Sequence, residues 1–512
     1  MHDDRTPVIV GVGQCTDRSD DLAAKREPIA LMEAAARLAL EDTRTRGLVG
    51  RIDSVRVVNM ISGAGYADPG GALAARLGLG SGERLYTAIG GNAPQWLVNR
   101  TADDLAEGRA RVALLAGAEA LATLRMAARR GVTLDWMRGR HTPAMIGDAR
   151  MGSHPDEWRH GAQRPAEIYP LFEIALRAHE HRTPEAHRQH IATLAASFAH
   201  VAAGNPHAWI RDGKSARQIG TVTHDNRMVA FPYPKFMTSV IDVDQAAAVV
   251  MTTVAEARRI GIPPDRMVYL HGAGDAHDIW HVKDRVDYHS SPGMALAFEE
   301  ALTQAGIPPT AIDVVDLYSC FPVAPRFAAR ILGWPSDGSR PLTVTGGLPY
   351  FGGPGNNYAM HAIVSLAERL RAAPGTLGLV SALGWYMTKH AVGIYGTIAP
   401  ARPWQRPDRA RQHASIEALP RPAYVASAAG AARIETYTVL HDRDGAPSEA
   451  IIIARLADGT RTLANTDPDP DIFRLLEQSE FVGAAGVVSP RSDGRNLFRL
   501  SGAERERGAW QN

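Results

Sequence analysis

The chain has 512 residues, which is too many for one hydrophobic core, so the sequence predicts two to four structural units. Apolar residues make up 45% and charged residues 22%, as in a typical globular protein, and a net charge of +1 excludes a strong attraction to nucleic acid or membranes. The two cysteines, Cys15 and Cys320, exclude a disulfide scaffold and a cysteine-based metal cluster.

The opening stretch MHDDRTPVIVGVGQ carries early acidic residues and lacks the apolar core of a signal peptide. No run of about 18 apolar residues occurs in the sequence, so we expect no membrane span and a cytoplasmic location. Residues 84–105 predict a strand that turns sharply into a helix at the pair Gly90 and Gly91. The apolar run 112–121 is typical of a strand buried on both faces.

Two parts of the chain repeat. The Ile-Asp pair at residue 52 recurs 260 positions later, at residue 312, and each pair follows a helix-like segment. The glycine pair at residue 90 recurs 256 positions later, at residue 346, and each pair precedes a helix. These similar spacings indicate a duplicated α/β half, with second-copy strands at 311–318 and 342–347.

Residues 126–239 do not fit the repeat. They are rich in Arg, His, Trp and Pro and contain one helix-like segment at 184–203. An insertion of this size on a loop is typical of a cap over a functional site. After residue 400 comes a Pro/Arg-rich linker, and residues 423–503 then alternate apolar and polar residues around two Asp-Gly turns, which predicts a small antiparallel β-barrel.

Three motifs occur in an order that resembles the thiolase superfamily. YTAIGGNAPQ (86–95) stands where thiolases hold their nucleophilic cysteine. DLYSCFPV (316–323) stands where sterol-carrier-protein-2 (SCP2) thiolase-like proteins have a His-Asp-Cys-Phe or Asn-Glu-Ala-Phe motif, and GGLPYFGGPGNN (346–357) where they have Gly-His-Pro. The chain is most similar to the type 1 thiolase-like proteins with an additional C-terminal domain.

The resemblance implies an α/β protein with a duplicated thiolase fold, in which two βαβαβαββ halves stack as α-β-α-β-α layers. A loop domain is inserted in the first half, and an OB-like β-barrel follows the second. The expected parts are the N-terminal half (1–125 and 240–258), the loop or cap domain (126–239), the C-terminal half (259–400), a linker (401–422) and the barrel domain (423–512).

The resemblance also shows that the catalytic positions are changed. Gly90 matches the nucleophilic cysteine, and Tyr318 matches the Asn or His that helps hold a water for the thioester oxyanion. Gly353 matches the His that activates the nucleophile, and we expect it to line the thioester site. The late acid/base cysteine should fall in 381–387, where no cysteine occurs. Thiolysis through an acyl-enzyme is therefore not expected.

Three functions stay open. The first is retro-aldol-type cleavage of a β-hydroxyacyl-CoA, as in related thiolase-like aldolases, with Tyr318 or Tyr350 as the base. The backbone N–H groups of Gly90, Gly91 and Asn92 would hold the thioester oxygen. Both tyrosines can instead be packing residues whose hydroxyl bonds to the backbone. The second function is acyl-CoA or lipid binding without catalysis, and the third is an assembly module whose barrel docks a partner.

Four further side chains are candidates. The thiol of Cys320 is a nucleophile only with a base beside it, and a small buried residue is the favoured interpretation. His390 can serve as a base in place of the missing His. Lys389 and Lys235 can bind a carboxylate or a phosphate of coenzyme A.

Coenzyme A esters are expected as substrate or ligand, with no separate cofactor. His187 and His190 lie three apart on a helix, but no acid completes a site, so no metal is expected. OB-folds can bind nucleic acid, but this barrel mixes acids with bases and is not expected to do so. Thiolases usually dimerise across the core, and a fused C-terminal domain can block that face, so a monomer is slightly favoured.

Overall fold

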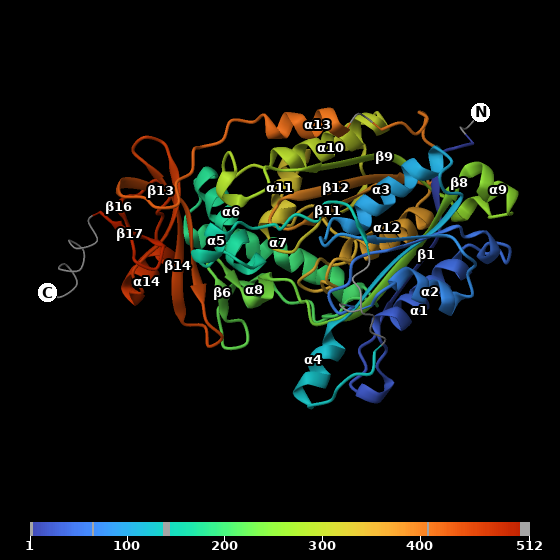
Figure 1. Ribbon diagram of the computed structural model, residues 1–512, viewed down its shortest axis with the longest axis horizontal. Coiled ribbons are helices and arrows are strands. Elements are labelled where there is room, and N and C mark those ends of the chain that lie inside the picture. Colours follow the sequence, from blue (N-terminus) through green and yellow to red (C-terminus); the bar gives the residue numbers. More distant parts are fainter. Residues whose placement is uncertain (1–3, 64–65, 137–143, 407–408, 502–512) are drawn as a thin grey trace.

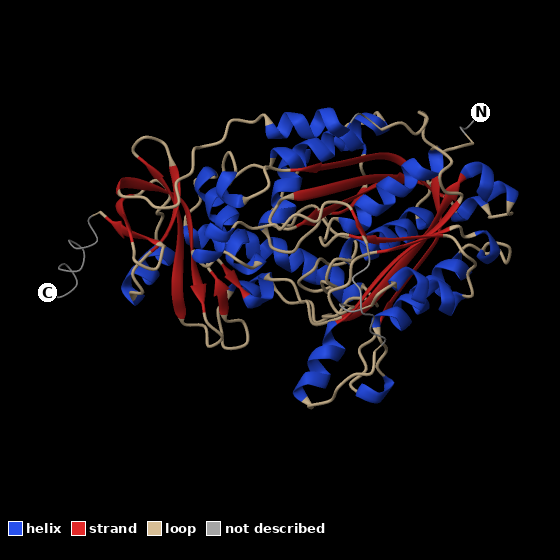
Figure 2. Ribbon diagram, viewed as in Figure 1, coloured by secondary structure: helices blue, strands red, loops and turns tan. Residues whose placement is uncertain are grey.

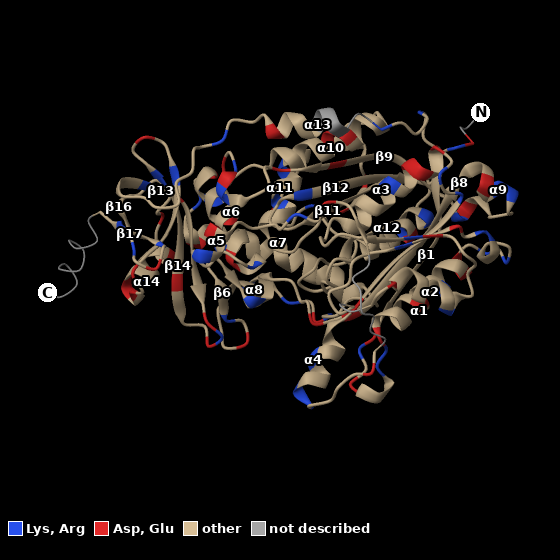
Figure 3. Ribbon diagram, viewed as in Figure 1, with Lys and Arg blue, Asp and Glu red and all other residues tan. Residues whose placement is uncertain are grey.

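The computed structural model describes residues 4–63, 66–136, 144–406 and 409–501. Two α/β halves form the core, and a β-barrel lies at one end of the elongated molecule, far from the N-terminus (Figure 1). Figure 2 shows helices layered against strands in the core and mainly strands in the barrel. Acidic and basic residues are interspersed along both parts (Figure 3), as the net charge of +1 suggests.

The first half is built on a mixed sheet in the order β3-β2-β4-β8-β1. Strands β2, β3 and β4 are parallel, and β8 and β1 are antiparallel to their neighbours. Side-chain caps fix two helix starts, since Asp68 and Thr253 accept backbone N–H groups at the beginning of α2 and α9. The elements are β1 (Pro7–Thr16), α1 (Pro28–Asp42), β2 (Ser54–Val57), α2 (Pro69–Leu77), β3 (Glu83–Thr87), α3 (Ala93–Ala106), β4 (Val112–Ala120), β8 (Asp244–Thr253) and α9 (Val254–Arg259).

The second half has strands in the order β10-β11-β12-β9 and one strand fewer than the predicted pattern. Residues 342–347, expected as a strand, form none. The backbone N–H groups of Val344 and Thr345 donate to the buried carboxylate of Asp316 at 3.0 and 3.1 Å, so they are not free for a sheet. The elements are β9 (Val268–His277), α10 (Pro292–Ala305), β10 (Val314–Asp316), α11 (Val323–Leu332), α12 (Tyr358–Ala372), β11 (Leu377–Gly384) and β12 (Lys389–Gly396).

The two halves join where β1 pairs with β9, through Val8 with Tyr269 and Ile9 with Val268. Helices α3 and α12 lie between the halves, because each contacts strands of both. Helix α1 covers the outer face of the first half, and α10 covers that of the second. The predicted five-layer α-β-α-β-α architecture is confirmed.

Each half also packs its first helix closely on its first strand through a Gly-x-Gly sequence, at 11–13 and at 272–274. A Cβ atom on Gly11 would overlap the carbonyl oxygen of Ala39 in α1, and one on Gly274 would overlap that of Ala297 in α10. The sequences lie 261 positions apart, close to the spacing of the repeat. Their glycines serve helix–strand packing.

The inserted segment is anchored to the second half by a buried charged cluster. Glu173 in α6 pairs with Arg326 in α11 and accepts hydrogen bonds from His187 and Tyr233 at 2.9 and 2.6 Å. Burial opposes its charge, but Arg326 and the two hydrogen bonds outweigh that effect and lower its pKa to about 2. The segment holds α4 (Leu121–Arg129), β5 (Met145–Ile146), α5 (Pro155–Arg159), α6 (Pro165–His179), α7 (Pro184–Gly204), α8 (Ala216–Gly220), β6 (Met228–Ala230) and β7 (Tyr233–Pro234).

Part of the predicted linker is helical, and five strands then close a barrel in the order β14-β15-β17-β16-β13, with β13 pairing back to β14. Strand β6 of the inserted segment adds to the same sheet through Ala230 and Leu440. The buried Arg461 donates to the carbonyl oxygens of Lys283 and Arg285, which docks the barrel on the core. The elements are α13 (Arg409–Glu417), β13 (Gly430–His441), β14 (Pro447–Leu456), β15 (Arg461–Asn465), α14 (Pro470–Gln478), β16 (Ala485–Pro490) and β17 (Asn496–Leu500).

Candidate functional site

The sharp turn between β3 and α3 matches the position at which thiolases hold their nucleophile. Gly90 has a φ of +150°, a conformation that residues with side chains rarely adopt. Its backbone N–H donates to Oδ1 of Asn356 at 2.9 Å. One of the three N–H groups expected to hold a thioester oxygen is therefore already bonded within the protein.

Side chains from elsewhere fill the space at this turn. A Cβ atom on Gly90 would lie 2.9 Å from Cε and 3.0 Å from Nζ of Lys389. One on Gly91 would overlap the hydroxyl of Tyr318. Gly384, in the stretch where the late cysteine was expected, likewise faces Oδ1 of Asn92. A cysteine at any of these three positions would displace its neighbour.

Tyr318 lies at the turn, as expected, but its chemistry differs from the predicted role of base. Its side chain is only 7% exposed and its ring meets that of Tyr358 edge-on, 5.6 Å between centroids. Burial raises the pKa of its hydroxyl far above the ordinary value of about 10. The hydroxyl therefore stays protonated at neutral pH, where it can donate a hydrogen bond but does not act as a base.

Tyr350 and Gly353 are each hydrogen-bonded to the segment between β7 and β8. The Tyr350 hydroxyl donates to the carbonyl oxygen of Phe236 at 3.0 Å, and its side chain is 1% exposed. The backbone N–H of Gly353 donates to the carbonyl oxygen of Val240 at 2.8 Å. For Tyr350 this is the packing role that sequence analysis kept as an alternative.

The geometry around Cys320 does not support a nucleophile. Burial raises the pKa of its thiol to about 12, although a hydrogen bond with Tyr169 partly opposes this shift. The Tyr169 hydroxyl itself donates to the carbonyl oxygen of Trp385 at 2.9 Å. At neutral pH the sulfur is a protonated, buried thiol.

His390 is hydrogen-bonded at the turn between β11 and β12. Its Nε2 lies 3.1 Å from the carbonyl oxygen of Met387 and 3.3 Å from Oγ of Ser291. Burial lowers its pKa to about 4, so the ring is neutral. Two residues of this turn, Trp385 and Met387, have a φ of +56°, a strained conformation for side chains of their size.

Lys389 begins β12 at the end of this strained turn. Its Nζ donates to the carbonyl oxygens of Ile89 and Asp148 at 2.5 and 3.1 Å, and its side chain is only 7% exposed. Burial lowers its pKa to about 8, a shift that Asp148 opposes and Arg150 adds to. Lys389, expected to bind a carboxylate or a phosphate of coenzyme A, lies inside the site, whereas Lys235 is exposed on the segment after β7.

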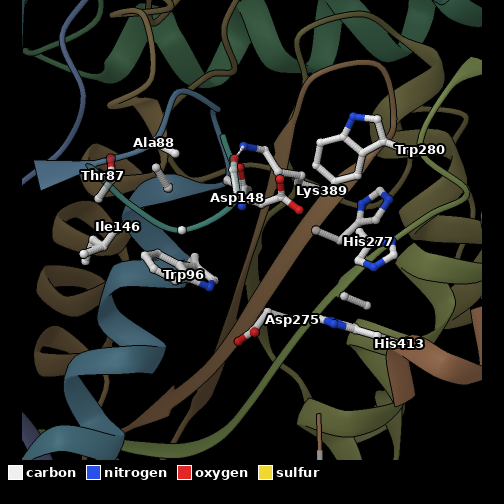
Figure 4. A pocket seen from close by; sticks show the side chains of 15 residues that line it. Thr87, Ala88, Trp96, Ile146, Asp148, Asp275, His277, Trp280, Lys389 and His413 are labelled. Carbon is white, nitrogen blue, oxygen red and sulfur yellow. Dashed lines mark hydrogen bonds between the residues drawn. The ribbon is translucent and has the colours of Figure 1, made fainter. Parts of the chain in front are cut away.

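A hollow of about 90 Å³ opens beside Lys389 at the N-terminus of α3. Figure 4 shows Trp96 on one side of it, Trp280 and His277 on the other, and Lys389 with Asp148 between them. Sequence analysis missed this hollow, because its lining comes from segments near residues 90, 147, 277, 390 and 413 that only the fold brings together.

The two histidines considered for metal binding lie at or near the buried charged cluster of Glu173. Nε2 of His187 bonds to Glu173 at 2.9 Å within the buried cluster, and His190 lies beside His187 with its pKa lowered to about 4 by burial. Across the described ranges, no three His, Cys, Asp or Glu side chains are grouped so as to hold a metal ion. No helix within those ranges is long and apolar enough to cross a membrane.

Comparisons with known proteins give the family. Residues 413–495 match the family model described as the thiolase-like protein type 1 additional C-terminal domain. The crystal structure of a monomeric SCP2-thiolase-like protein type 1 from Mycobacterium smegmatis is 34% identical, with a TM-score of 0.85, and the match covers 98% of this chain and 100% of that chain.

More distant structures share the fold. The Ltp2–ChsH2(DUF35) aldolase is 19% identical with a TM-score of 0.57, over 77% of this chain and 98% of that chain. An acetyl-CoA acetyltransferase from Syntrophomonas wolfei is 17% identical with a TM-score of 0.55, over 77% and 99%. A search of curated proteins finds no match. Because the Mycobacterium smegmatis relative aligns over nearly the whole length at 34% identity, the chain belongs to the SCP2-thiolase-like proteins of type 1, in the thiolase superfamily.

Proposed function

We propose that this protein acts on an acyl thioester, such as a coenzyme A ester, without an acyl-enzyme, and that it cleaves a carbon–carbon bond by retro-aldol-type chemistry. The main support is the presence of an amine and a hydroxyl, in place of a thiol, at the Gly90 turn. Where a thiolase presents a thiol, this chain places the Lys389 amine against Gly90 and the Tyr318 hydroxyl over Gly91. These groups transfer protons or donate hydrogen bonds, and neither needs a covalent acyl intermediate.

Lys389 and Tyr318 have different roles in this reaction. In a β-hydroxyacyl thioester, the neutral amine of Lys389 takes the β-hydroxyl proton, the Cα–Cβ bond breaks and the β carbon leaves as an aldehyde or ketone. The electron pair moves to the thioester as an enolate, which is then protonated at the α carbon. The protonated hydroxyl of Tyr318 and the partial positive charge at the N-terminus of α3 stabilise the enolate oxygen.

A second candidate function is binding of a thioester without turnover. The hydrogen bond from Gly90 to Asn356 favours it, because that N–H group is not free to stabilise an oxyanion. A protein that binds without reacting needs no such donor. The two candidates share the ligand and differ in the products.

The experiment follows a panel of acyl-CoA and β-hydroxyacyl-CoA esters by mass spectrometry, together with the intact protein mass. We expect cleaved products without any protein adduct, and a loss of cleavage in Lys389→Met and Tyr318→Phe. Tyr350→Phe is the matched control, because its hydroxyl is bonded to the backbone of Phe236. Unchanged esters that still raise the melting temperature would instead support binding alone, and an acyl adduct on Cys320 would contradict the proposal.

A further inference from the structure

We propose that Lys389 captures a small aldehyde or ketone as an imine within the hollow that it lines. This activity goes beyond the proposed function, because it needs neither a thioester nor coenzyme A. It shares with that function only the amine.

The hydrogen bonds of Nζ leave it with one free position. A neutral lysine amine has two N–H donors and one lone pair. The carbonyl oxygens of Ile89 and Asp148 accept two hydrogen bonds from Nζ. These bonds can use both donors of the neutral amine, and its lone pair is then left for the hollow that Lys389 lines. A lone pair so placed can attack a carbonyl carbon.

The walls of the hollow suit a small, uncharged carbonyl compound. Trp96, Trp280 and Ile146 supply apolar or aromatic surface, and the hollow of about 90 Å³ has room for a small molecule. The Asp148 carboxylate is bonded to Arg150, whose guanidinium lies 3.8 Å above the Trp280 ring. The acid nearest to Lys389 is thus engaged elsewhere, so the site does not strongly favour the ammonium form.

Among the five lysines, Lys389 differs in its partners. Lys25 pairs with Asp244 and Lys283 with Asp284, both at 2.8 Å, and Lys214 pairs with Asp212. Lys235 is exposed to water, which also stabilises an ammonium group. Lys389 is buried and bonded to two neutral carbonyl groups, and burial lowers its pKa to about 8, so a useful fraction is neutral at physiological pH.

The step balances without a further reactant. The Nζ lone pair forms a bond to the carbonyl carbon, the carbonyl oxygen takes up a proton, and the resulting carbinolamine loses that oxygen as water to give the imine. No electrons leave the system, and hydrolysis reverses the reaction. When the imine is protonated it keeps one N–H, which can still donate to the carbonyl oxygen of Ile89 or Asp148.

The test traps the imine by reduction. The intact protein is mixed with propanal or benzaldehyde and cyanoborohydride at pH 7, and alkylated lysines are located by peptide mass spectrometry over time. We expect Lys389 to be alkylated at least tenfold faster than the exposed Lys235, because Lys389 lines the hollow and burial lowers its pKa to about 8. Raising the pH from 7 to 9 should increase labelling of Lys389 and then level off.

Two variants test the hollow itself. Ala88→Leu adds bulk to its lining, so we expect slower labelling of Lys389 and unchanged labelling of Lys235, once a melting curve has shown that the variant is folded. Lys389→Arg should abolish the fast adduct. Equal labelling of Lys389 and Lys235 in the unmodified protein would overturn the inference. That result leaves the thioester experiment unaffected, so the two proposals fail separately.

Discussion

The side-chain oxygen Oδ1 of Asn356 accepts the backbone N–H of Gly90 at 2.9 Å, although 266 positions separate the two residues. The same amide group donates through Nδ2 to the backbone carbonyl oxygen of Asn59, also at 2.9 Å. Asn356 thus ties the loop before α12 to two loops of the first half. The contact joins the first and third motifs and engages the backbone N–H of Gly90.

Removing this contact should destabilise the protein. In Asn356→Ala the buried N–H of Gly90 loses its acceptor, so we expect the free energy of unfolding in urea to fall by about 1–3 kcal/mol. Asn59→Ala is the comparison, because it removes only the 3.3 Å bond from Nδ2 of Asn356 to Oδ1 of Asn59 and keeps the backbone carbonyl as acceptor. Equal free energies of unfolding for Asn356→Ala and the unmodified protein would show that the hydrogen bond contributes nothing.

A side chain at position 384 should lower the free energy of unfolding, and shortening the neighbouring Asn92 should restore most of it. Gly384→Ala would push its methyl group into Oδ1 of Asn92, so we expect a loss of about 1–3 kcal/mol. In the double variant with Asn92→Ala the overlap disappears, and most of that loss should be recovered. A double-mutant cycle measures the recovery, and strictly additive losses would contradict the packing described.

Stability should also depend on the protonation of His390. Its pKa is about 4 in the folded protein and about 6.5 unfolded, so between these values the unfolded chain binds more protons. The stabilisation is therefore complete above pH 6.5 and is lost as the pH falls through 4, by up to about 3 kcal/mol. We expect His390→Gln to flatten the fall between pH 6.5 and 4 in urea unfolding, and parallel curves for the two proteins would refute the assignment.

In solution we expect a monomer. Strand β5 pairs with the outer edge of β3, through Tyr86 with Met145, so this edge is not open to a second chain. The linker covers α3, where Nε1 of Trp404 donates to Asp103 at 2.9 Å. Sedimentation equilibrium should give a mass near 55.1 kDa at micromolar concentration, and a concentration-dependent dimer would contradict the prediction.

The fold could be predicted well because its signals are local or periodic. The repeat, the turn at Gly90 and the Asp-Gly turns of the barrel all depend on short stretches of sequence. The Gly-x-Gly sequences at 11–13 and 272–274 belong to the same repeat, but only the fold shows that they serve helix–strand packing. The strand predicted at 342–347 does not form, because its backbone N–H groups bind the carboxylate of Asp316. No local sequence pattern indicates a contact with so distant a residue.

The site was harder to predict, because burial and register decide its chemistry. The sequence identified Lys389 and Tyr318, but it could not show that both lie against the Gly90 turn. The place of Lys389 depends on its pairing with Gly384 in one neighbouring strand and His277 in the other. Burial then lowers the pKa of the lysine and raises that of the tyrosine, so residue type alone does not give the proton affinity of either group.

The sheet shared by β6 and β13 has a consequence for synthesis on the ribosome. The backbone N–H of Phe231 bonds to the carbonyl oxygen of Val439 at 2.8 Å, so the inserted segment takes its final partner from the far end of the chain. At about 5–20 residues per second, the ribosome needs roughly 10–40 s to make the residues between them. During that interval the edge of β6 has no barrel strand to pair with, and the nascent chain is exposed to mispairing and to chaperones until its last domain emerges.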